Sequence, residues 1–131
     1  MITNPDLARL AEGLGVVLRK HTGGPKGWYD HQSRTISTRR RLSIAEYRST
    51  LAHELAHAIY GDTPRFGRYK VRQERRADRY AANLLLTPSA VEEALIWHQH
   101  HRAPAAYDLE VTQHLLNVWL DHNRCPARQR Q

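Results

Sequence analysis

Three residues of one short segment could bind and use a metal ion. In "STLAHELAHAIYGD" (49–62), His53, Glu54 and His57 form the pattern H-E-x-x-H. On an α-helix the two histidines lie one turn apart and about 40° apart around the axis, so both rings can bind one ion. Glu54 projects to the flank of this face, where it could take a proton from a water molecule without binding the metal. The pattern therefore indicates a metal site with an adjacent general base.

The same pattern has a simpler interpretation, namely two surface histidines beside a glutamate that forms a salt bridge. Leu51, Leu55 and Ile59 fall on the opposite side of the predicted helix, which gives it an apolar face for the core and a separate face for ligands. A second histidine cluster, "WHQHHR" (97–102), is interpreted as solvated side chains at a helix end rather than as another metal site.

A catalytic zinc site needs a third protein ligand and keeps its fourth position for water. The longer motif H-E-x-x-H-x-x-G-x-x-H is absent, because Tyr60 and Thr63 occupy its glycine and last histidine positions. A following helix offers Glu74, which shares one face with Ala77 and Asp78. We predict that Glu74 is the third ligand and that Asp78 accepts a hydrogen bond from a ligand histidine. The alternative is that both carboxylates pair with neighbouring arginines.

The elements that must position these residues carry their own signals. Ser43 with Glu46 three residues later forms a capping box, so a helix should begin there and run to Tyr60, where Gly61 ends it. Other helices are predicted over 4–13 (capped by Asn4), 68–86, 88–101 and 108–122, with a break at "RAPAAY" (102–107). A strand is predicted over 15–20 and a hairpin over 28–40. The fold class is therefore α+β: a small antiparallel-containing sheet of about three strands packed against a helical bundle that carries the H-E-x-x-H helix.

Length and composition favour one globular domain in a reducing compartment. The chain has 131 residues, of which 40% are hydrophobic and 25% charged, and its one cysteine, Cys125, cannot form an internal disulfide. Neither a signal peptide nor a membrane-spanning run is apparent, so we expect a cytoplasmic protein without a membrane partner.

The net charge is +7, and the excess arginines gather in 39–41, in 65–79 and in the C-terminal tail. A solvated arginine face is the favoured interpretation. The alternatives are an acidic protein partner or nucleic acid. Direct nucleic-acid binding is not favoured, because no nucleic-acid-binding motif accompanies the charge.

Together, "YRSTLAHELAHAIYGD" (47–62) and "ERRADRYAANLLLTP" (74–88) resemble the ImmA/IrrE family of metallo-endopeptidases. That family pairs H-E-x-x-H with a second motif whose counterparts here are Glu74, Ala77, Asp78, Tyr80, Ala81, Leu84, Leu85 and Pro88. The resemblance covers residues 14–90 well and the last helix only loosely. It implies a gluzincin-like fold in which His53, His57 and Glu74 bind the metal and Glu54 is the base. The metal would be zinc, with manganese and iron as alternatives.

The resemblance also implies a function. One zincin-like metallopeptidase domain is expected over 1–123, with a disordered basic tail over 124–131. Relatives of this kind regulate transcription in bacteria and their mobile elements by cleaving or disabling a helix-turn-helix repressor. With no room for its own DNA-binding domain, the chain is expected to act on a separate helix-turn-helix repressor of phage or mobile-element type.

The alternative is a non-catalytic regulator, stabilised by its metal, that binds and disables a repressor or another acidic partner through its arginines. The vacant fourth position and the presence of Glu54 favour the enzyme. An oxyanion-stabilising residue is not assigned among the candidates Tyr60, Tyr80 and Tyr107.

Overall fold

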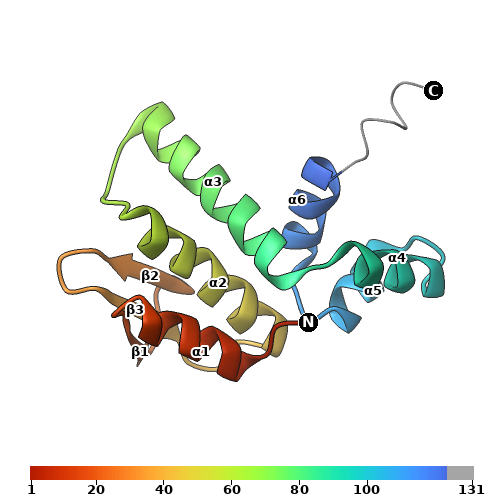
Figure 1. Cartoon of the computed structure of the whole chain (residues 1–131), viewed down its shortest axis with the longest axis horizontal. Helices are drawn as coiled ribbons and strands as arrows, with labels where there is room; N and C mark the ends of the chain where they lie inside the picture. The colour runs from red at the N-terminus through yellow and green to blue at the C-terminus, as the bar shows by residue number, and fades with distance from the viewer. Residues whose placement is uncertain (124–131) are drawn as a thin grey trace.

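The computed structural model describes residues 1–123, which form an α+β fold as predicted (Figure 1). Its elements are α1 (Asn4–Gly13), β1 (Val17–His21), β2 (Gly27–Asp30), β3 (Thr35–Arg39), α2 (Ile44–Tyr60), α3 (Gly67–Leu85), α4 (Pro88–Trp97), α5 (Arg102–Asp108) and α6 (Gln113–Asn123). None of these helices combines the length and the apolar character that crossing a bilayer requires. The prediction for the tail, 124–131, lies outside the described residues, and the single domain over 1–123 stays a prediction.

The three strands form a mixed sheet in the order β1-β3-β2. The predicted hairpin is confirmed, since β2 pairs antiparallel with β3 and places Trp28 opposite Ser37. The first strand instead runs parallel to β3, with Leu18 opposite Ile36. Because β3 is central, β2 lies at the edge of the sheet, and its outer side has no strand partner among residues 1–123.

Helix α2 lies at the centre of the molecule, with the sheet on one side and α3 on the other (Figure 1). Its capping box is present: the Ser43 hydroxyl accepts a hydrogen bond from the Glu46 N–H, and the Glu46 carboxylate accepts one from the Ser43 N–H. Gly61 ends the helix in the left-handed conformation, with φ of 64°. Both signals therefore place α2 where the sequence predicts it.

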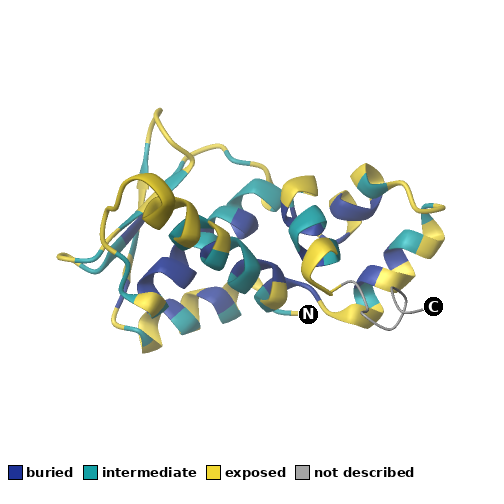
Figure 2. Ribbon diagram, turned by 90° about the horizontal axis from the view of Figure 1, so that it is seen from above, coloured by how far each residue is buried: buried dark blue, intermediate teal, exposed yellow. Residues whose placement is uncertain are grey.

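The core fills the space between α2, the sheet and the later helices, as the buried faces in Figure 2 show. Ala77 and Ala81 of α3 are fully buried against α2, and these short side chains let the two helix backbones come close together. Fully buried larger residues include Leu7, Ile36, Leu51, Leu55, Leu115 and Leu116.

Several predicted helix ends were wrong. Thr3, not Asn4, caps α1 by accepting a hydrogen bond from the Asp6 N–H. The segment 102–107, predicted as a break, belongs to helix α5. Pro104 is compatible with a helix here because it lies in the first turn, where its missing N–H breaks no helical hydrogen bond. The helix predicted to reach residue 101 ends at Trp97, since Gln99 and His100 adopt positive φ. The last helix begins at Gln113 rather than 108.

Candidate metal centre

Helices α2 and α3 bring His53, His57 and Glu74 together. The Nε2 atoms of the two histidines lie 3.2 Å apart, and each is 3.0 Å from an oxygen of Glu74. Two ligands of a tetrahedral zinc ion, each ~2.0–2.1 Å from the metal, lie about 3.3 Å from one another. The three side chains therefore form a cluster that could hold a metal ion, and no fourth histidine, cysteine or carboxylate of residues 1–123 joins it.

The Nδ1 atom of each imidazole, on the side of the ring away from the cluster, contacts a carboxylate. His53 Nδ1 lies 2.8 Å from Oδ1 of Asp78, and His57 Nδ1 lies 2.8 Å from Oδ2 of Asp62. A carboxylate accepts a hydrogen bond, so each Nδ1 carries the proton and each Nε2 can turn a lone pair toward the cluster. This donor set of two imidazole nitrogens and one carboxylate suits zinc.

Asp62 was not singled out by the sequence analysis. It follows Gly61, whose left-handed backbone folds the chain back so that the Asp62 N–H donates to the His57 carbonyl at 2.9 Å. The Asp62 carboxylate then reaches the His57 ring, and its other oxygen accepts a hydrogen bond from Arg76 at 2.5 Å. The glycine stop was visible in the sequence, but the direction of the next side chain depends on the packing of α3.

Asp78 lies where the sequence predicts it and has a second partner. Its other oxygen lies 3.0 Å from Nε2 of His114, which belongs to α6 and is largely exposed. Helix α6, which the family resemblance covered only loosely, therefore contributes to the surroundings of the cluster.

The charges of the cluster are balanced by one another. Burial disfavours a charged His53 ring, but its hydrogen bonds to Asp78 and Glu74 outweigh that effect and raise the pKa of His53 to about 10. The hydrogen bond from His53 also lowers the pKa of Glu74. In the metal-free protein the site therefore holds a proton where a cation would bind.

Glu54 lies between two hollows beside the cluster. One hollow, here called the metal cleft, has a volume of about 470 Å³ and is lined by residues that include Trp28, Tyr29, His57, Phe66, Lys70 and Glu74. The other has a volume of about 440 Å³ and is lined by residues that include Lys26, Thr50, His53, Asp78 and His114. Gly27 and Glu54 line both, and burial raises the pKa of the Glu54 carboxyl. This side chain can therefore reach a proton of a molecule bound in either hollow.

Gly27 of β2 makes the closest approach of the sheet to α2. A Cβ atom at this position would lie 2.6 Å from Cγ2 of Thr50, 3.1 Å from the Ser37 carbonyl oxygen and 3.5 Å from Cγ of Glu54. Any larger residue would push β2 away from Thr50 and Glu54 of α2, so the short distance between strand and helix depends on this glycine.

A family comparison agrees with this geometry. The model of Peptidase_M78, described as the IrrE N-terminal-like domain, matches residues 11–118. The chain belongs to this family. The match confirms the resemblance found in the sequence and extends it into the first half of α6. No curated protein matches the chain.

Membership of the Peptidase_M78 family supports peptidase activity in general. The individual roles of His53, Glu54, His57, Glu74 and Asp78 stay predictions that the geometry fits.

No tyrosine named in the sequence analysis lines either hollow beside the cluster. Tyr60 and Tyr80 pack edge to face with ring centroids 6.2 Å apart, and Tyr107 is 80% exposed. Tyr29 of β2 is the tyrosine that lines the metal cleft. The oxyanion-stabilising residue therefore stays unassigned.

Proposed function

We propose that this chain is a zinc-dependent endopeptidase in which His53, His57 and Glu74 bind the metal and Glu54 is the general base. The single observation that carries the proposal is the cluster of three ligands beside a buried glutamate that faces a cleft. A purely structural zinc site would have four protein ligands, whereas a catalytic site has three and an open position.

The chemistry divides between the metal and the chain. A bound zinc ion would polarise the scissile carbonyl and lower the pKa of a coordinated water molecule toward about 7. Glu54 would accept the proton of the attacking water and deliver it to the leaving amine, a role that its raised pKa favours. Asp78 and Asp62 would keep His53 and His57 in the tautomer and orientation that binding requires.

A polypeptide has a natural path past Glu54. Both hollows are lined by residues of β2 or by Lys26 directly before it, and no strand within residues 1–123 pairs with the outer side of this edge strand. An extended substrate could therefore lie alongside β2 and form main-chain hydrogen bonds with it. The aromatic side chains of Trp28, Tyr29 and Phe66 in the metal cleft would contact apolar side chains of that substrate.

We also propose that the enzyme acts as a regulator and that its substrate is a separate helix-turn-helix repressor of phage or mobile-element type. The support for this substrate is the resemblance to the ImmA/IrrE family alone. The direct experiment is to incubate the zinc-loaded protein with such a repressor encoded beside its gene and to look for fragments by mass spectrometry.

The decisive variant is Glu54→Gln, which keeps the size of the side chain and removes the base. It should retain about one zinc ion per chain while peptide cleavage falls below detection. Cleavage at the parent rate would reject the proposed base. If the variant still disabled the repressor without cutting it, the non-catalytic regulator would be the better description.

A further inference from the structure

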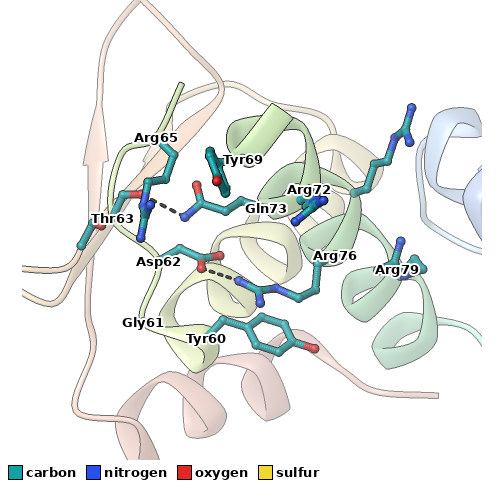
Figure 3. A pocket seen from close by; sticks show the side chains of 11 residues that line it. Tyr60, Gly61, Asp62, Thr63, Arg65, Tyr69, Arg72, Gln73, Arg76 and Arg79 are labelled. Atoms are coloured by element: carbon teal, nitrogen blue, oxygen red, sulfur yellow. Dashed lines mark hydrogen bonds and ion pairs between the residues drawn. The ribbon is translucent and has the colours of Figure 1, made fainter. Parts of the chain in front are cut away.

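A further concave surface, distinct from the two hollows beside Glu54, shares Asp62 with the metal cleft. This pocket has a volume of about 660 Å³ and is formed by the end of α2, the segment that follows it and one face of α3 (Figure 3). Five arginines line it: Arg65, Arg72, Arg75, Arg76 and Arg79. We call it the arginine pocket.

The positive charge of the arginine pocket is largely unneutralised. Asp62 is the one acidic residue among its described lining residues, and its two oxygens already accept hydrogen bonds from His57 and Arg76. No salt bridge within residues 1–123 involves Arg72, Arg75 or Arg79. An anionic ligand would therefore meet several free guanidinium groups at once.

The arginine pocket adjoins the metal cleft. Asp62, Thr63, Arg65 and Gln73 line both, and Gln73 spans the boundary by donating a hydrogen bond to the Thr63 carbonyl at 3.0 Å (Figure 3). An extended chain bound in the metal cleft would reach the arginine pocket by passing over the residues that the two hollows share.

The spacing of the arginines fits a short stretch of extended polypeptide. On α3 they recur at positions 72, 75, 76 and 79, which places them along one side of the helix over about 10 Å. Three residues of an extended chain cover about the same length. Guanidinium groups bind carboxylates through paired hydrogen bonds, which makes a run of aspartates or glutamates the matching ligand.

We propose that the arginine pocket binds an acidic run of the protein substrate, next to the bond that is cut. The inference rests on the proposed endopeptidase function and adds the class of sequence that the enzyme selects. A nucleic-acid duplex fits less well, because it carries its phosphates on a convex surface whereas these arginines surround a hollow.

Binding can be measured without cleavage. The probes are two fluorescein-labelled peptides of equal length, one with four consecutive glutamates and one with four glutamines, added to the zinc-loaded Glu54→Gln protein. Fluorescence anisotropy at low salt should show the glutamate peptide binding at least about tenfold more tightly. The double variant Arg72→Gln/Arg75→Gln, in this background, should lose most of that preference.

The matched control is Arg19→Gln/Arg40→Gln, which removes the same charge from exposed positions on and beside the sheet. Neither residue lines the arginine pocket or the metal cleft. Circular dichroism should show that both double variants keep the parent fold, since all four side chains are exposed. If both double variants lost the same amount of binding, the preference for the glutamate peptide would come from net charge alone, and the proposal would be overturned.

Two other outcomes also overturn it. Equal affinity for the glutamate and glutamine peptides would remove the acidic preference, and tighter binding of a single-stranded oligonucleotide at Arg72 and Arg75 would assign the pocket to nucleic acid. These experiments distinguish a failure of the pocket assignment from a failure of the proposed peptidase function. Parent protein that binds the acidic peptide but cuts no substrate would reject the peptidase, whereas cutting without acidic preference would reject only the pocket assignment.

Discussion

The two histidines of the candidate metal centre are supported by carboxylates that are held in different ways. Asp62, behind His57, has a side chain that is 8% exposed, is fixed by the turn at Gly61 and is paired with the cation of Arg76. Asp78, behind His53, is 22% exposed and shares its second oxygen with His114, whose side chain is 70% exposed. The orientation of His57 is therefore set by a nearly buried carboxylate that Arg76 also holds, whereas that of His53 depends on a contact that water can replace.

The largest effect should come from Glu74, the residue that both histidines share. Glu74→Ala removes one of three ligands, so the bound zinc should fall from about one ion per chain to near zero. Elemental analysis after gel filtration measures this ratio. Glu93→Ala, an exposed glutamate of α4, is the control that should keep its zinc. Full zinc occupancy in Glu74→Ala would show that this carboxylate is not a ligand.

Asp62→Asn should weaken zinc binding by about 100-fold, the upper end of the usual range for residues that support a metal ligand. The neutral amide accepts the His57 hydrogen bond less strongly and leaves Arg76 without its anion. Because Nε of Arg76 is already buried without a partner, the melting temperature should fall as well. Competition with a chelator gives the affinity, and calorimetry gives the melting temperature.

Asp78→Asn should weaken zinc binding by only about tenfold, because water can replace part of the lost interaction at this more exposed carboxylate. The same competition assay compares the two variants side by side. A larger loss for Asp78→Asn than for Asp62→Asn would reverse the comparison and would mean that the contact between α3 and α6 is the firmer support.

The smallest effect concerns the metal-free protein and pH. The pKa of His53 is raised to about 10 in the folded state from an ordinary value of 6.5. Its protonated form therefore stabilises the fold fully below pH 6.5, and this contribution is lost as pH rises through 10. In the presence of a chelator, the melting temperature of Asp78→Asn should fall less steeply between pH 7 and 10 than that of the parent. Parallel curves would contradict the coupling of His53 to Asp78.

The parts of the site that sequence predicted are those governed by local rules. The capping box at Ser43 and the stop at Gly61 fix α2, and helical periodicity places Glu74 and Asp78 on one face of α3. Helix geometry places the two imidazoles one turn apart and Glu74 on the same face as the alanines of α3. Because these small side chains allow close packing against α2, the cluster could be predicted from the sequence.

Other features depend on contacts between distant segments. His114 is 36 positions from Asp78, and nothing in either segment predicts that α6 docks on α3 at this point. The parallel pairing of β1 with β3 is likewise a choice of topology, since the same strands could form an antiparallel meander. The error at Pro104 has a simpler cause: proline breaks a helix in its interior but fits its first turn.

In the part of the chain that the structure describes, no strand pairs with the outer side of β2, and under the proposed function this limits how fast a target would be cut. A helical or otherwise compact segment cannot add to a strand edge, so the target must first open locally and expose a stretch of free main chain. Each ~1.4 kcal/mol of opening free energy lowers the fraction of exposed target tenfold. Mutations that destabilise the target, even far from the cut bond, should then accelerate its proteolysis although the enzyme is unchanged. Mild heating that opens the target should have the same effect.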